Sequence, residues 1–220
     1  MKLTKGVKAN RYQSIAQSIE FFLEEYPGGF HGEHFIEHER NYKVKAHETA
    51  LSLLSQNEFE SRLKANDYKE ICKRALKIVN ATNLVFPNEK MSLKDGLDKG
   101  ENQIFFAEAL YKLLFDQSKF KDRFSFFSDM LYKIGAAKWT IASYFLFIFF
   151  PKEYMFVKPT ATKNAANLSA FQINYRSDLN WKTYKSVLDF SEYLKSELKE
   201  LKPRDMIDVQ SFMWCIMPND

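Results

Sequence analysis

The sequence has few glycines, prolines and cysteines for its length, and each shortage excludes a class of fold. Seven glycines and six prolines among 220 residues are too few for the frequent turns of a β-sandwich, so long helices with few breaks are expected. The two cysteines, Cys72 and Cys215, form no C-x-x-C pair, and each lies in an apolar helical stretch. We therefore expect two reduced thiols of a cytoplasmic protein and no disulfide framework.

The sequence also lacks an apolar run long enough to span a bilayer. The longest such run, residues 141–150, contains Ser143 and Tyr144 and is far shorter than the roughly 20 residues that a membrane-spanning helix needs. The first twelve residues are basic but have no apolar centre of the kind found in secretory signals. These features predict a cytoplasmic location and no membrane partner.

Large apolar side chains at helical spacing are abundant. Aromatic residues make up 16% of the chain and include 21 phenylalanines, enough to fill the core of a unit of this size. Apolar positions recur every three or four residues, which predicts amphipathic helices and a mainly α fold, a compact multi-helix bundle. The expected helices cover residues 10–25, 33–55, 57–65, 67–80, 104–115, 119–134, 137–150, 160–170, 181–201 and 203–217.

The stretch 137–150 is the most apolar of these, and Pro151 ends it. We expect it to be a buried central helix, covered by the Phe-rich helices before it and two long helices after it. Residues 154–157 are expected to form at most a short strand or an extended segment. Residues 81–100 are expected to be irregular apart from one helical turn at 92–97, and they would join a possible N-terminal helical subdomain, 1–80, to the rest of a single globular unit, 1–220.

The net charge of +4 is unevenly distributed along the chain. Residues 138–185 hold seven basic side chains against two acidic ones, and residues 1–12 hold four basic side chains and no acidic one. Such an asymmetry is typical either of a protein that binds a polyanion or of a basic face exposed to solvent.

Two basic stretches are candidates for binding phosphate. Arg40, Lys43 and His47 are spaced to share one face of a helix. On such a face a guanidinium can donate two parallel hydrogen bonds to a phosphate, and an imidazole can donate another. A surface ladder of ion pairs explains the same spacing.

The second stretch begins at Lys158, where a proline opens a helix and leaves backbone N–H groups free beside Thr160 and Lys163. Arg176 and Trp181 follow, so that basic and aromatic residues interleave as they do where bases stack. A capped helix beside a core tryptophan is the alternative.

His34, Glu37 and His38 match the pattern H-x-x-E-H. Histidines four residues apart on a helix can bind one zinc ion while the glutamate acts as a base. The pattern supplies no third ligand, and an exposed polar helix face explains it equally well. No cofactor is therefore predicted, and zinc is kept as the alternative.

Arg204, Asp205 and Asp208 precede and begin the last helix. The two aspartates could be paired catalytic carboxylates, but a helix N-cap and a first-turn acid account for them better. No catalytic residue is assigned from the sequence.

Six segments resemble a family of uncharacterised bacterial proteins of about this length. They are ERNYKVKAH (39–47), NLVFPNEKMSLKDGL (83–97), KWTIASYFLF (138–147), FVKPTATKNAA (156–166), LNWKTY (179–184) and PRDMIDVQSFMW (203–214). The resemblance covers most of the chain and carries no activity with it. The positions that it marks for testing are Arg40, Lys43, His47, Lys158, Pro159, Trp181, Arg204, Asp205 and Asp208.

The leading hypothesis is a binding module for nucleic acid or another phosphate-bearing ligand. Its predicted ligand-binding residues are Arg40, Lys43, His47, Lys158, Thr160, Lys163, Arg176, Trp181 and Arg204. One alternative is a metal-dependent hydrolase that uses the H-x-x-E-H residues. Another is a protein-interaction scaffold whose aromatic residues are partly exposed.

Overall fold

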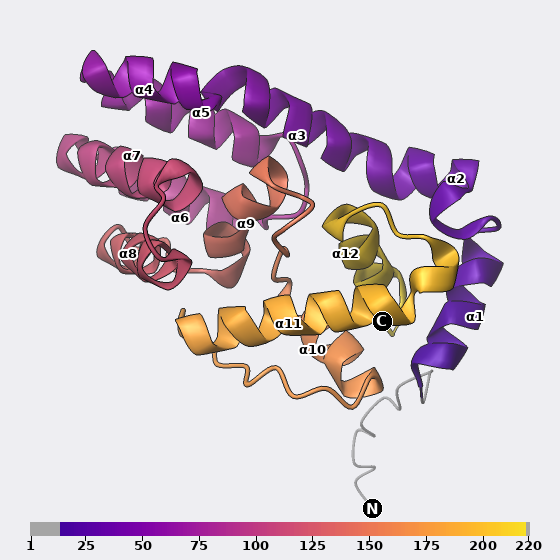
Figure 1. Ribbon diagram of the computed structural model, residues 1–220. Coiled ribbons are helices and arrows are strands. Elements are labelled where there is room, and N and C mark those ends of the chain that lie inside the picture. The colour runs from indigo at the N-terminus through magenta and orange to yellow at the C-terminus, as the bar shows by residue number, and fades with distance from the viewer. Residues whose placement is uncertain (1–13, 219–220) are drawn as a thin grey trace, which may run out of the picture.

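A computed structural model describes residues 14–218, and every regular element in that range is helical (Figure 1). The mainly α prediction is confirmed. The basic residues 1–12 and the start of the helix expected at 10–25 lie outside the described range. The elements are α1 (Ile15–Glu25), the 3₁₀ turn η1 (Gly29–His31), α2 (Glu33–Phe35), the π-helical turn η2 (Ile36–Arg40), α3 (Asn41–Leu54), α4 (Gln56–Lys64), α5 (Tyr68–Asn80), α6 (Pro87–Leu97), α7 (Gly100–Phe115), α8 (Phe120–Lys133), α9 (Trp139–Phe149), α10 (Pro159–Leu168), α11 (Trp181–Glu197), the 3₁₀ turn η3 (Lys199–Leu201) and α12 (Met206–Cys215).

The helices pack around α9 (Figure 1). Helices α3, α4 and α5 lie side by side along one edge, and α7 pairs with α8 next to them. The long helix α11 runs along the opposite side of the molecule, and α12 packs against α10, α11 and η2. Helix α12 therefore connects the N-terminal and C-terminal thirds of the chain.

Helix α9 is buried along its whole length, as predicted for the central helix. Two of its polar side chains are hydrogen-bonded inside the core: the Tyr144 hydroxyl donates to the Ile78 carbonyl at 2.9 Å, and the Ser143 hydroxyl donates to the Trp139 carbonyl at 2.7 Å. Ser143 Oγ also accepts from the Val157 N–H at 2.8 Å. This last bond fixes the segment before α10, which is extended and pairs with no strand among residues 14–218.

The prediction of an irregular stretch over residues 81–100 was wrong, because most of it is helix α6. Pro87 stands at the first helical position, where its missing N–H costs nothing, and Glu89 Oε2 accepts from the Phe86 N–H at 3.1 Å. Gly96 lets the helix approach the loop after α8, since a Cβ there would lie 2.4 Å from the Ile134 carbonyl oxygen. Residues 81–86 form an irregular link before α6, and residues 98–99 separate α6 from α7.

Within the described residues, no helix has the combination of length and apolar character that crossing a membrane requires. Cys72 and Cys215 are both free thiols.

Candidate functional site

The helix predicted over residues 33–55 forms, but a π-helical turn, η2, interrupts it at Ile36–Arg40. A π turn holds one more residue than an α turn and is frequent at functional sites. This turn packs against α12, which lies more than 160 residues later in the chain. Two neighbouring polar clusters form where these elements meet.

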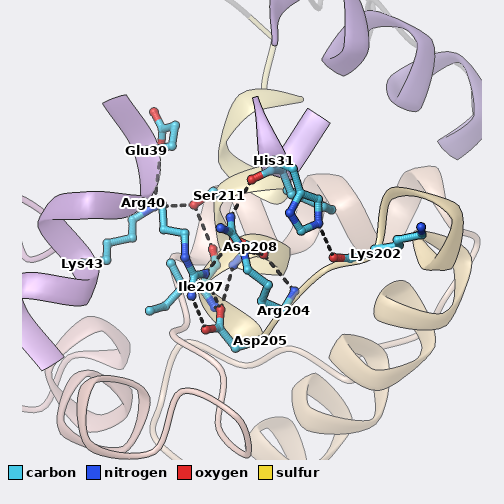
Figure 2. Close-up of polar contacts among 11 residues, drawn as sticks. His31, Glu39, Arg40, Lys43, Lys202, Arg204, Asp205, Ile207, Asp208 and Ser211 are labelled. Carbon is cyan, nitrogen blue, oxygen red and sulfur yellow. Dashed lines mark hydrogen bonds and ion pairs between the residues drawn. The ribbon is translucent and has the colours of Figure 1, made fainter. Parts of the chain in front are cut away.

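The first cluster is an ion-pair network around Arg40 (Figure 2). The Arg40 guanidinium donates to Asp205 through Nη1 and Nη2, at 2.8 and 2.6 Å, and Nη1 also donates to Asp208 Oδ1 at 2.8 Å. Asp205 is the residue before α12, and it also accepts from the Ile207 and Asp208 N–H groups, at 3.0 and 3.4 Å, so the predicted N-cap is confirmed.

Arg204 completes the network. Its Nε donates to Asp208 Oδ2 at 2.9 Å, its Nη2 to Asp208 Oδ1 at 3.1 Å, and its backbone N–H also reaches Oδ2 at 2.9 Å. Arg204 Nη2 donates further to the Phe30 carbonyl. Two guanidinium groups therefore balance two carboxylates, and the network joins η1, η2 and α12.

Burial lowers the pKa of Arg40, but hydrogen bonds and charges from Asp205 and Asp208 outweigh it and hold that pKa above its usual value. Arg40 stays charged and its donors face carboxylates. Within the described residues, the predicted ligand-binding residues Arg40 and Arg204 thus join elements of the fold.

His47 also makes a bond within the protein. Its Nδ1 donates to the carbonyl of Ile148 at 2.6 Å and so joins α3 to α9. Of the predicted trio on this helix, Lys43 alone lines a pocket that also holds Lys158.

The second cluster is a pocket of about 130 Å³, which we call the Lys43–Lys158 pocket. Its walls come from η2 and α3, from the link between α5 and α6, from the start of α10 and from α12. The residues that line it are His38, Glu39, Tyr42, Lys43, Asn83, Leu84, Lys158, Gln210 and Trp214.

Lys43 is 1% exposed, which is unusual for a lysine. Its Nζ donates to Ser211 Oγ at 2.7 Å and to Glu39 Oε2 at 3.3 Å (Figure 2). Ser211 in turn donates to the Ile207 carbonyl, so its oxygen is oriented as an acceptor. Burial lowers the pKa of Lys43, and the nearby Glu39 charge opposes that shift.

Lys158 forms no ion pair within residues 14–218. Its Nζ donates to the Leu84 carbonyl at 3.0 Å and lies 3.5 Å from the ring centroid of Phe86 and 5.7 Å from that of Trp214. Burial lowers its pKa, and the charge of Glu89 partly opposes the shift. An ammonium has three donors, so donors remain for a ligand.

Gln210 contributes an amide to the same pocket. The residue is 3% exposed, and its Oε1 is buried without a hydrogen-bond partner among the described residues. An orphaned buried amide oxygen is costly and rare in folded proteins.

The remaining predicted ligand-binding residues lie elsewhere. Thr160 is exposed at the start of α10, and Lys163 Nζ lies 5.0 Å from the ring centroid of Tyr175, beside a separate depression. Arg176 is exposed, and its backbone carbonyl accepts from Trp139 Nε1. Trp181 packs edge-on against Phe120, with ring centroids 5.4 Å apart. Of the residues predicted in the second basic stretch, Lys158 is the one that lines the pocket.

The H-x-x-E-H histidines stack on each other. The ring centroids of His34 and His38 are 4.3 Å apart, and His38 Nδ1 donates to the His34 carbonyl at 2.9 Å. Within the part of the chain that the structure describes, no group of three or more His, Cys, Asp and Glu side chains is arranged to hold a metal ion.

The sequence reasoning assigned no binding role to six residues of the pocket: Glu39, Tyr42, Asn83, Leu84, Gln210 and Trp214. One signal was available. Apolar residues stand three and four positions before and after Gln210 in the last helix, and one of them is Trp214, on the same face. A polar side chain on the apolar face of a helix is a reason to look for a polar pocket.

Comparison of the chain with protein-family models, with curated proteins and with solved structures finds no match.

Proposed function

We propose that this protein is a binding module for a phosphate-bearing ligand, such as a nucleotide or a nucleic acid strand, and that the ligand occupies the Lys43–Lys158 pocket. One observation carries the proposal. Two lysines from segments 115 residues apart line the same small pocket, and one of them has no carboxylate partner among the described residues. An ammonium with unused donors is a common phosphate ligand.

The pocket retains positive charge after its internal pairing is counted. Glu39 offsets Lys43, whereas the contacts of Lys158 Nζ within residues 14–218 are a carbonyl oxygen and two aromatic rings. Those rings, Phe86 and Trp214, are about half exposed. Exposed aromatic rings beside a free cation are typical of surfaces on which nucleotide bases stack.

The test is fluorescence anisotropy of labelled single-stranded and double-stranded DNA and RNA, with unlabelled nucleotides as competitors, at several salt concentrations. We expect affinity to fall as salt rises, because binding releases counterions from the phosphates. Lys158→Gln should lower affinity by about tenfold or more, since a hydrogen bond to a charged group contributes about 1.5–3 kcal/mol.

Lys163→Gln is the matched control, because Lys163 lies on the same helix and the substitution removes the same charge. We expect it to change affinity by less than about twofold, as an exposed charge outside the site does. Equal losses in the two variants would place binding on a broad basic surface and contradict the pocket. Absence of binding at low salt would refute the proposed function.

A further inference from the structure

Two further surface depressions follow the Lys43–Lys158 pocket across the molecule. The second lies between α3 and the end of α5, and it shares Tyr42 with the pocket. The third is lined by α5, by the end of α6 and by α7, and it shares Lys77 and Asn80 with the second. The pocket therefore opens a path along α3 and α5, which lie side by side (Figure 1). We call the three depressions together the lysine track.

The charged residues of the lysine track are mostly basic. Within residues 14–218 they are six lysines and two carboxylates: Lys43, Lys45, Lys69, Lys73, Lys77 and Lys158, with Glu39 and Asp98. Like Lys158, the ammonium groups of Lys45, Lys69 and Lys77 form no ion pair within that range. The excess of positive charge favours an extended polyanion as the occupant.

Helix α5 places three of these lysines in a row. Lys69, Lys73 and Lys77 follow one another at intervals of four residues, so they share one face and are about 6 Å apart along the helix axis. All three are exposed. Lys73 pairs with Glu70 at 3.4 Å, but an exposed pair contributes little to stability, so a phosphate can replace the carboxylate at little cost. Such a row suits a chain of repeated phosphates better than one phosphate group.

The pocket end of the lysine track adds exposed aromatic rings. Phe86 and Trp214 are about half exposed, and their ring centroids lie 3.5 and 5.7 Å from Lys158 Nζ. Aromatic side chains beside a basic groove are the surfaces on which the bases of a single strand stack. The bases of a duplex are already stacked on one another. The rings therefore favour an unpaired strand over a duplex.

We propose that the lysine track binds a single strand of nucleic acid, with bases stacked on Phe86 and Trp214 and the sugar–phosphate backbone following Lys77, Lys73 and Lys69. This inference rests on the proposed function and specifies its ligand as a strand rather than a free nucleotide. Single-stranded DNA and RNA share this chemistry.

Fluorescence anisotropy with oligothymidine and oligouridine of one to twelve nucleotides, at several salt concentrations, tests the proposal. We expect affinity to rise at least about tenfold from the mononucleotide to the longest strand, because each added phosphate reaches a further lysine. The salt dependence should steepen in parallel, by about 0.7 in the slope of log K against log salt for each phosphate neutralised.

A triple variant that carries Lys69→Gln, Lys73→Gln and Lys77→Gln removes the row on α5. It should bind the longest strand about tenfold or more weakly, with a salt slope shallower by about 2, because about three phosphate contacts are lost. Its affinity for the mononucleotide should equal that of the wild type, because the Lys43–Lys158 pocket is unchanged.

The matched control carries Lys182→Gln, Lys185→Gln and Lys199→Gln. These lysines are exposed, lie on α11 or just after it on the opposite side of the molecule (Figure 1), and include one exposed ion pair, that of Lys185 with Asp189. The control should bind the longest strand within about twofold of the wild type. Circular dichroism checks that both variants are folded.

The outcomes separate this inference from the proposed function. Affinity that does not rise with length, or equal losses in the two triple variants, would overturn the strand site and leave phosphate binding in the pocket in place. Duplex DNA or inorganic polyphosphate that binds as tightly as the strand would also overturn it, since neither offers free bases. Failure of every ligand to bind at low salt would overturn both. Among supporting outcomes, a preference for oligothymidine identifies DNA as the source, and a preference for oligouridine identifies RNA.

Discussion

The ion-pair network around Arg40 and the Lys43–Lys158 pocket lie next to each other, but their buried polar groups differ in whether they have partners inside the protein. Arg40 of the network and Lys43 of the pocket are three residues apart where η2 meets α3. Asp208 of the network and Gln210 of the pocket are two residues apart in α12. In the network, each guanidinium meets a carboxylate. In the pocket, Lys158 has no carboxylate and the Gln210 oxygen has no donor within the described residues.

Stabilising the fold and binding a ligand impose opposite demands on polar groups. A buried charge that joins two elements needs its partners inside the protein, since removing one leaves the other uncompensated. A group that binds a ligand must keep some donors or acceptors unused until the ligand arrives, at a cost to the stability of the empty protein. The two clusters therefore respond differently to substitution.

Breaking the ion-pair network around Arg40 should lower the stability of the protein more than any other change considered. Asp208 is fully buried and accepts from Arg40 and Arg204. Asp208→Asn keeps its shape, removes its charge and should lower the free energy of unfolding by about 3 kcal/mol, because two guanidinium groups lose a partner. Urea denaturation followed by circular dichroism measures the change.

Asp189→Asn is the control for that variant. Asp189 pairs with Lys185 on the surface of α11, and both side chains are about half exposed. We expect a change below about 0.5 kcal/mol, as for other exposed pairs. If Asp208→Asn destabilised the protein no more than this control, the network would not hold η2 against α12.

Removing the unpartnered amide of Gln210 should change stability in the opposite direction. Gln210→Met is expected to raise the free energy of unfolding by about 1 kcal/mol, because the buried oxygen then no longer lacks a partner. Thermal and urea denaturation of the ligand-free proteins measure it. A clear loss of stability would show that the amide supports the fold, and the contrast between the two clusters would fail.

The smallest expected effect is a dependence of binding on pH. Burial holds the pKa of Lys158 below 10.5, so its ammonium loses its proton at a lower pH than an exposed lysine does. Affinity for a phosphate-bearing ligand should therefore fall as an alkaline pH series passes through that lowered pKa, and the fall should begin at a lower pH than for an exposed lysine. The phosphate itself is already ionised in this range.

Lys158→Arg should reduce this dependence, because a guanidinium stays charged throughout. Anisotropy titrations of the two proteins at matched ionic strength compare them. If affinity fell equally with pH in both proteins, the pH dependence would come from another group, such as Lys43 or a tyrosine.

Most of the fold was predictable from local sequence, since the elements depend on short-range spacing. The apolar spacing over residues 67–80, the N-cap at Asp205 and the apolar run of α9 each indicate a helix or its beginning, and the structure confirms them. The error at α6 has a local cause: residues 81–100 are mostly polar, but a proline at the first helical position and a glutamate two residues later begin a helix.

The site was less predictable, because its residues meet only in the folded chain. Lys43 and Lys158 were named from basic stretches, but their convergence on one pocket requires η2, α10 and α12 to be packed. The same packing directs Arg40 to Asp205 and Asp208, more than 160 residues away, and directs Trp181 to Phe120. Spacing along a helix gives the face of a side chain but not its partner.

The sequence by itself determined which segments are helices and that residues 139–149 must be buried, because period and hydrophobicity act over a few turns. Only the tertiary structure decided which polar groups are paired and which remain open. Arg40 and Lys43 are both basic, and one turn of chain separates them. Arg40 pairs with two carboxylates, whereas Lys43 lines a pocket. The difference depends on which elements, distant in sequence, pack against each side chain and supply its partners.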